Sequence, residues 1–252
     1  MASHDELRDA IAGAKRILVF TGAGISVDSG IPDFRSPGGV WTRIDPLTLS
    51  ADRIQGSRRD REAFWRAMVE VAESVGQPAP NPAHAAVARL QRRGQVVLVA
   101  TQNVDGLHQA AGSPPETVAE LHGNLARCRC VACGTRYPTA EVLGWLRAGE
   151  TLPTCQACGG FVRPDVVVFG DPLPMRALDR AHAAAFDCDL CLVLGSSLMV
   201  HPAADIPVRA RRAGARLVVV TLSTTPVDAL CDLRVRAPLG EVFVQAVADL
   251  GD

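Results

Sequence analysis

Five short apolar segments of the chain lack the polar alternation of a half-exposed strand. Helical patterns lie between or beside them, at residues 83–93, 174–186 and 202–213. Unalternated strands among helices are typical of a parallel sheet that helices cover on both faces. The sequence therefore predicts an α/β fold, with strands at residues 17–20, 96–100, 166–169, 190–194 and 217–220.

Polar loops begin where the predicted strands end. They read TGAGIS, TQNVDG, VFGD, GSSLMV and TLSTTP. In parallel sheets of this kind, ligands bind at the carboxyl ends of the strands. We therefore expect the five loops to converge on one binding edge.

An inserted segment separates the first two predicted strands. They lie about 75 residues apart, whereas a plain strand–helix–strand unit takes roughly 30 residues. The insertion begins with the Gly/Pro-rich stretch SPGGVWTRIDP and continues with an amphipathic helical pattern over Asp60–Ser74. A proline-rich break at residues 78–82 ends it.

Charge and hydropathy exclude several classes of partner. The 252 residues carry a net charge of −1 and are 48% hydrophobic, so a sizeable core is expected and no basic surface for nucleic acid or an anionic membrane. The N-terminal residues are charged where a secretory signal would be apolar, and no apolar stretch reaches about 18 residues. We expect a cytoplasmic protein without a membrane span. The sequence has no signal for an oligomeric state.

Two near repeats of the form C-x-A-C-G predict a metal site. They comprise Cys130 with Cys133, and Cys155 with Cys158. Each turn presents two thiolates to one ion, and four thiolates make a closed tetrahedral zinc site with a structural role. Cys128 lies close by but outside the repeat, while Cys188 and Cys191 precede or lie in an apolar strand and are expected in the core.

The stretch TGAGISVDSGIPDFRS has the start of a dinucleotide-binding turn. Gly22-Ala23-Gly24 follows a strand, and a predicted helix comes next, which would hold a pyrophosphate at backbone N–H groups. The usual third glycine is replaced by Val27, and no acidic residue is recognisable at the end of a second strand. An ordinary hydride-transferring dehydrogenase is therefore disfavoured.

Three further groups of residues have both a structural and a functional interpretation. Asp33, Phe34 and Arg35 are either a cap, a core residue and a surface residue, or a patch that pairs with phosphate and covers a planar ring. Gln102, Asn103 and Asp105 suit either turn chemistry or recognition of a carboxamide and ribose hydroxyls. His122, in LHGN at a domain junction, is a candidate general base.

Taken in order, the motifs from Gly22 to Pro226 resemble those of the sirtuins, the NAD-dependent protein-lysine deacylases. The motifs are GAGISVDSGIPDFRS, TQNVDGLHQAAG, LHGN, two CxxCG turns, RPDVVVFGD and GSSLMVHPAA. The resemblance implies a Rossmann-like NAD-binding domain and a small domain, with NAD consumed as co-substrate and acyl-lysine peptides as partners. We expect the first domain at residues 1–36, 83–123 and 164–252. The small domain would combine a helical insertion at 37–82 with a four-cysteine zinc ribbon at 124–163.

The resemblance also implies a role for each motif. His122 would be the general base that acts on a ribose hydroxyl after the acyl oxygen displaces nicotinamide. Residues expected at NAD are Gly22, Ala23, Gly24, Asp33, Phe34, Arg35, Gln102, Asn103, Asp105, Gly195, Ser196, Ser197 and Thr221. Val168, Phe169, Gly170 and Val200 would clamp an extended substrate peptide by strand addition.

Some residues depart from the family pattern. Asp171 and Ser196 stand where the family often has Glu and Thr, and Thr221 stands where it usually has Asn, which weakens the assignment on the adenosine side. Two alternatives to a deacylase remain. One is a protein mono-ADP-ribosyltransferase, and the other is a non-catalytic zinc-ribbon adaptor, which the mildly positive ribbon and the retained glycine loop disfavour.

Overall fold

The structure, a computed structural model, describes residues 4–32, 39, 45–75 and 78–251. Its larger sheet has six parallel strands in the order β3-β2-β1-β7-β8-β9. Their bounds are β1 Ile17–Thr21, β2 Val96–Thr101, β3 Val118–Glu120, β7 Leu190–Leu194, β8 Arg216–Val220 and β9 Leu233–Val235. Every residue of β1 and β7 is buried, because helices cover both faces. The predicted fold class is confirmed.

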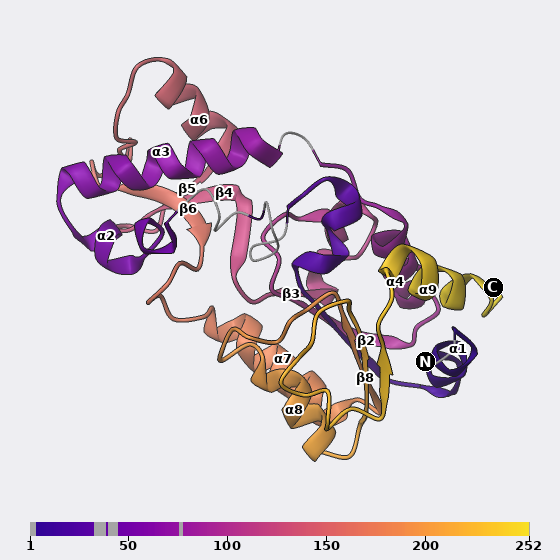
Figure 1. Cartoon of the computed structure of the whole chain (residues 1–252). Coiled ribbons are helices and arrows are strands. Elements are labelled where there is room, and N and C mark those ends of the chain that lie inside the picture. Colours follow the sequence, from indigo (N-terminus) through magenta and orange to yellow (C-terminus); the bar gives the residue numbers. More distant parts are fainter. Residues whose placement is uncertain (1–3, 33–38, 40–44, 76–77, 252) are drawn as a thin grey trace.

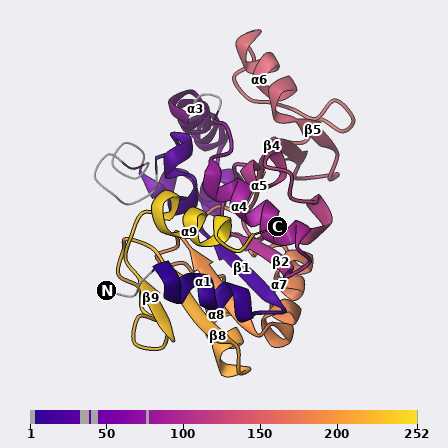
Figure 2. The ribbon, with the colours of Figure 1, turned by 90° about the vertical axis from the view of Figure 1, so that its right-hand side faces the viewer.

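Two layers of helices enclose this sheet (Figures 1 and 2). On one face a continuous core joins the strands to α1 His4–Gly13, α4 Pro82–Arg92 and α9 Leu239–Ala248. On the other face a second core joins them to α7 Met175–Asp187 and α8 Asp205–Arg212. The start of α4 is set by Asn81, whose side chain accepts from the backbone N–H groups of Ala83 and His84.

A second body of structure comes from two insertions far apart in the sequence. The first contributes η4 Pro46–Thr48, α2 Ala51–Gln55 and α3 Arg58–Val75. The second contributes a three-stranded antiparallel sheet, β5-β4-β6, with bounds β4 Gly123–Cys130, β5 Arg136–Pro138 and β6 Val162–Val166, and the helix α6 Thr139–Arg147. Helix α3 lies along this sheet in Figure 1. Phe64, Trp65 and Met68 share one core with it, and the Trp65 indole donates to the carbonyl of Val162 at 2.9 Å.

Two predictions of local structure were wrong. The run 166–169 is not a strand of the main sheet: Val166 ends β6, and Phe169 forms only an isolated bridge to Ser50. Its apolar side chains divide between two cores instead: Val166 and Val168 pack in the small core, and Val167 packs against a core of the main sheet. After Gly22-Ala23-Gly24 the chain forms two short 3-10 turns, η1 Ala23–Ile25 and η2 Val27–Ser29, in place of a regular α-helix.

Candidate active site and metal centre

The carboxyl ends of β1, β2 and β7 lie side by side at one edge of the main sheet. In the sheet, β2 and β3 lie on one side of β1, whereas β7, β8 and β9 lie on its other side. This is the reversal of strand order at which doubly wound sheets open a crevice for ligands. Four of the five predicted loops follow strands of this sheet; VFGD reaches the region from β6.

The glycines of the first loop are explained by the close approach of the β7 loop. Gly24 donates its N–H to the carbonyl of Gly195 at 2.8 Å, and Gly22 donates to Leu194 at 3.1 Å. A Cβ at Gly24 would lie 2.7 Å from the Gly195 oxygen, and one at Gly22 would lie 2.8 Å from the Cα of Ser196. The two N–H groups are thus engaged within the protein, and the glycines are required because two backbones touch.

The third glycine of the dinucleotide pattern is not needed here. Val27 occupies its place at the start of η2, and its side chain is exposed. The turn instead ends at Gly30, which has a left-handed φ of 82°. The missing third glycine, which disfavoured a dehydrogenase, is therefore explained by a different turn geometry.

A polar network connects the first loop to the loop after β2. The Asn103 amide donates to the carbonyl of Gly22 and to Ser26 Oγ, both at 3.1 Å. Ser26 Oγ in turn donates to Asp105 Oδ2 at 2.7 Å. The Gln102 amide reaches the β7 loop and donates to Ser196 Oγ at 2.8 Å. The structure therefore brings all three predicted residues of TQNVDG to the glycine turn.

His122 follows β3 and faces the same edge. Its Nδ1 lies 2.9 Å from the carbonyl oxygen of Gln102. Because a carbonyl can only accept, this contact places the ring proton on Nδ1 and leaves the Nε2 lone pair available. Burial lowers the pKa of His122, partly offset by this hydrogen bond, so the imidazole is neutral at physiological pH.

Two buried histidines, His84 and His108, contact residues of the first loop and the strand before it. No functional role was predicted for them from the sequence. His108 Nε2 lies 2.9 Å from Thr21 Oγ1, and His84 Nε2 lies 3.4 Å from Ser26 Oγ. The two rings meet edge to face, with centroids 5.1 Å apart. Helical spacing could place His84 on a buried face, but it could not reveal a contact with a loop 58 residues earlier.

The expected peptide clamp lies at the junction of the two bodies. The backbone N–H of Phe169 donates to Leu49 at 3.2 Å, and its carbonyl accepts from Ala51 at 2.8 Å. The Phe169 ring is about half exposed, whereas the Val168 side chain is buried. In the β7 loop, which contains the other predicted clamp residue Val200, Leu198 has a left-handed φ of 53°, uncommon for a non-glycine residue.

The remaining predicted cofactor residues are only partly placed. Thr221 follows β8, is buried, and its N–H donates to the carbonyl of Val235. Ser197 continues the β7 loop. Asp33, Phe34 and Arg35 lie outside the described residues.

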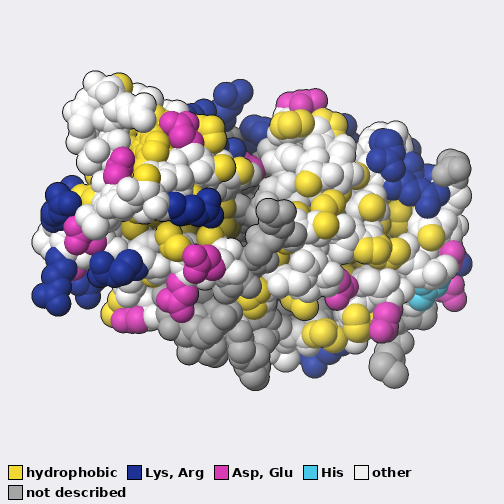
Figure 3. Space-filling model, turned by 90° about the horizontal axis from the view of Figure 1, so that it is seen from above, with side chains coloured by type: hydrophobic (Ala, Val, Ile, Leu, Met, Phe, Trp, Pro, Cys, Tyr) yellow, Lys and Arg dark blue, Asp and Glu magenta, His cyan; other side chains and the backbone are white. Residues whose placement is uncertain are grey.

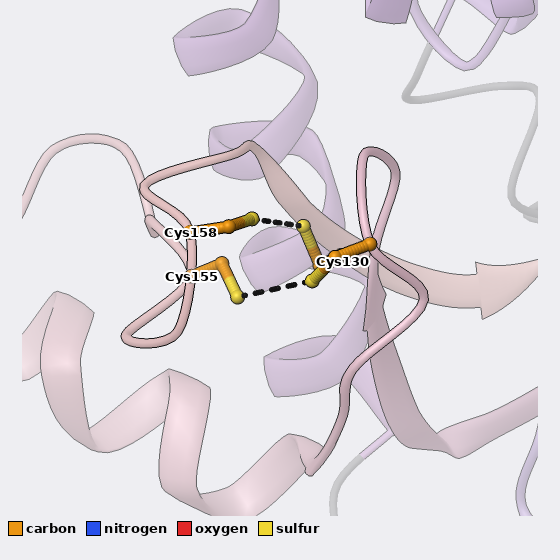
Figure 4. A group of neighbouring side chains, drawn as sticks. Cys130, Cys155 and Cys158 are labelled. Carbon is orange, nitrogen blue, oxygen red and sulfur yellow. Dashed lines mark hydrogen bonds between the residues drawn. The ribbon is translucent and has the colours of Figure 1, made fainter.

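Four thiols converge in the small body and form a candidate metal centre. The Sγ atoms of Cys130, Cys133, Cys155 and Cys158 all lie within 4.8 Å of one another. Two of these distances, Cys130–Cys158 and Cys133–Cys155, are 3.6 Å, close to the edge of about 3.8 Å of a tetrahedron with Zn–S bonds of about 2.3 Å. In Figure 4 the labelled side chains point toward one another from two separate turns.

The surroundings of the thiols fit a closed structural zinc site. The Tyr137 hydroxyl lies 3.1 Å from Cys155 Sγ, an outer contact of the kind that orients a metal ligand. Cys128 is excluded from the group, since its Sγ faces Thr139 Oγ1 at 3.4 Å. Cys188 and Cys191 are buried in the main core, where burial raises the pKa of both thiols, as expected of core cysteines.

The fold and the site define a dinucleotide-binding α/β protein with a separate four-thiol metal module. The sequence model of the Sir2 family matches residues 22–202 of the chain. The chain is 42% identical to the NAD-dependent protein deacylase 2 of Archaeoglobus fulgidus over 98% of this chain and 96% of the relative. It is 43% identical to the NAD-dependent protein deacetylase 1 of Bradyrhizobium diazoefficiens over 95% and 93%. A solved structure of Sir2 with a deacetylated p53 peptide and 3′-O-acetyl ADP ribose superposes with a TM-score of 0.91 at 37% identity, covering 99% of this chain and 98% of the other. The chain belongs to the Sir2 family.

Proposed function

We infer that the protein is an NAD-dependent protein-lysine deacylase, most simply a deacetylase, that transfers the acyl group to ADP-ribose and releases nicotinamide. The observation that carries this inference is the neutral His122, held by the carbonyl of Gln102 beside the glycine turn. A base of this kind suits proton removal from a ribose hydroxyl. Dehydrogenases can also use a histidine for proton transfer, and they are disfavoured here by the glycine turn, in which Val27 replaces the usual third glycine.

We propose specific roles for the remaining residues. Gly22, Ala23 and Gly24 would line the pyrophosphate, and the two glycines let this loop pack directly against the β7 loop. Gln102, Asn103 and Asp105 would hold the ribose and the nicotinamide carboxamide, with Asn103 and Asp105 joined through Ser26. Gly195, Ser196 and Ser197 would bind on the adenosine side, and Ser196 accepts a hydrogen bond from Gln102. Residues 168–170 and Val200 would hold the peptide. Asp33, Phe34 and Arg35 would surround the nicotinamide ribose and shield the reacting sugar, as the family resemblance implies.

The metal has a different task. Zinc at Cys130, Cys133, Cys155 and Cys158 would leave no position open for water, so it would hold the module together and take no part in acyl transfer. We also propose the division into a Rossmann-like domain and a small domain made of residues 37–82 and 124–163. Its support is the core that α3 shares with the strands of the ribbon.

The alternatives are less well supported. On the face seen in Figure 3, Lys and Arg side chains are mixed with Asp and Glu, which does not favour a nucleic-acid adaptor. None of the described helices is both long and apolar enough to cross a membrane.

We propose that the protein is located in the cytoplasm. The support is that none of its eight cysteines forms a disulfide bond.

The test is to mix the protein with NAD and an acetyl-lysine peptide. We expect nicotinamide and O-acetyl-ADP-ribose in equal amounts by mass spectrometry. His122→Ala should lower turnover by roughly 10²–10⁴-fold, the usual contribution of a general base, while NAD still binds. His182→Ala, on α7, is the matched control and should retain turnover.

Two outcomes would contradict these proposals. Release of nicotinamide without loss of the acetyl group, together with labelling of the protein by ADP-ribose, would favour a mono-ADP-ribosyltransferase. Normal turnover in His122→Ala would remove the base assignment and leave the family membership untouched.

A further inference from the structure

Arg163 is the one Lys, Arg, Asp or Glu that is buried among the described residues, with 3% of its surface exposed. It lies on β6, in the small body. Burying a charge is strongly unfavourable unless the charge is paired and hydrogen-bonded. A guanidinium in this position therefore needs a specific compensating partner.

The partner is a carboxylate in the loop that follows β6. Arg163 Nη2 donates to Asp171 Oδ2 at 2.7 Å and to the carbonyl of Val166 at 2.6 Å. Asp171 Oδ2 also accepts from the backbone N–H of Val168 at 3.2 Å, and the Asp171 N–H donates to the Val168 carbonyl at 3.0 Å. The ion pair thus closes the turn of residues 168–171 from both ends.

At its other end, Arg163 is fixed relative to the four thiols. The preceding residue, Val162, accepts the Trp65 indole N–H and donates its own N–H to Pro153. Gly160, two residues earlier, is so close to the metal centre that a Cβ there would lie 2.9 Å from Cys130 Sγ. A displacement of the thiol cluster would therefore move β6 and the guanidinium with it.

The turn that Arg163 holds and the residue just before it, Val167, form hydrogen bonds to two functional segments. The Val167 N–H donates to the carbonyl of His122 at 2.8 Å. The backbone of Phe169 pairs with residues 49 and 51, which sets the direction of the proposed peptide-binding edge. One buried side chain therefore connects the metal module, the proposed clamp and the segment that carries the base.

We propose that Arg163 and Asp171 are a positioning pair that sets peptide affinity by holding residues 168–170 in the geometry of strand addition. The proposal rests on the deacylase function inferred above, because it assigns the same loop to the peptide. Arg163 does not touch the reacting atoms. Its effect should therefore appear in the binding of peptide and not in the binding of NAD.

The experiment compares four variants with the wild type: Asp171→Asn, Asp171→Glu, Arg163→Met and the double variant Arg163→Met/Asp171→Asn. Breaking a buried charged hydrogen bond should weaken peptide affinity by at least about tenfold. We therefore expect Asp171→Asn to raise KM for the acetyl-lysine peptide by that factor, with KM for NAD and zinc content unchanged. Asp171→Glu should restore most of the affinity, and the double variant should lose less affinity than the product of the two single effects, because the two side chains act as one pair. Fluorescence anisotropy of a labelled acetyl-lysine peptide measures affinity without turnover.

The control is Arg136→Met, which removes an exposed arginine from β5 of the same sheet and should change nothing. If Arg163→Met fails to fold, the two Asp171 variants still decide the question. An Asp171→Asn protein with wild-type peptide affinity would overturn the proposal, as would equal losses in peptide and NAD affinity, which indicate general damage. A wild-type protein that does not deacetylate the peptide would instead contradict the proposed function.

Discussion

At the scale of single residues, the buried pair His84 and His108 shows how the site is supported. His108 is 1% exposed, and burial lowers its pKa to about 3. Burial also lowers the pKa of His84 and His122. Three neutral imidazoles therefore lie within or beside the same polar network, and each binds a proton less readily in the folded protein than in the unfolded chain.

This arrangement predicts that acid destabilises the protein. Between pH 6.5 and about 3 the unfolded chain binds a proton at His108 and the folded chain does not, so stability present above pH 6.5 is lost as the pH falls. The slope should be about 1.4 kcal/mol per pH unit for His108, with further contributions from His84 and His122. Urea unfolding at pH 7, 6 and 5 measures it.

His108→Gln tests the assignment, because the amide can keep a hydrogen bond to Thr21. The variant should lose stability less steeply on acidification, while His182→Gln should behave as the wild type. An unchanged slope in His108→Gln would show that other groups cause the pH dependence.

At the scale of elements, the contact between the β1 and β7 loops restricts both glycines of the first loop. Gly24→Ala would place a methyl group 2.7 Å from the Gly195 carbonyl, which is backbone and cannot rotate away. We expect a loss of roughly 1–3 kcal/mol in unfolding free energy, the usual cost of overpacking, and weaker NAD binding because the loop must shift. Thermal unfolding and calorimetric titration with NAD measure the two effects.

Gly144→Ala provides the matched control. Gly144 lies within α6, where an added methyl group would have no atom within 4 Å, so the same substitution should be neutral or stabilise by up to about 1 kcal/mol. A Gly24→Ala protein that is as stable as the wild type and binds NAD equally well would refute the loop contact as the reason for the glycine.

The sequence predicted the elements whose signals are local. Strands β1, β2, β7 and β8 have apolar runs of four or more residues, and the four cysteine ligands follow from spacing alone. Strands β3 and β9 have only three residues each and no such run. The run 166–169 was misassigned because apolar composition does not distinguish a main-sheet strand from a segment packed against a second core. Ser26 was missed as a connecting residue, since its partners lie 58 to 79 residues away.

At the scale of the whole molecule, the small body depends on its four thiols. Its core includes Cys130 and Cys155 together with Phe64 and Trp65 of α3. Structural zinc contributes about 10–16 kcal/mol of apparent binding free energy in small metal modules. Loss of the ion should therefore release α3 as well as the ribbon.

Cys155→Ser should lose zinc and unfold the small body while the six-stranded sheet keeps its secondary structure. Metal analysis gives the zinc content, and tryptophan fluorescence reports unfolding because Trp65 and Trp145 both belong to this core. Cys128→Ser, which removes a buried thiol outside the group, should keep its zinc. Equal zinc content in the Cys155→Ser and wild-type proteins would exclude Cys155 from the ligands.

The shared core of α3 and the ribbon also has a consequence for biosynthesis. Trp65 and its acceptor Val162 are 97 residues apart. At translation rates of about 5–20 residues per second, α3 is synthesised roughly 5–20 s before β6. During that interval its apolar face has no native partner, so the nascent chain is most exposed to aggregation and to chaperones before the second pair of cysteines has been synthesised.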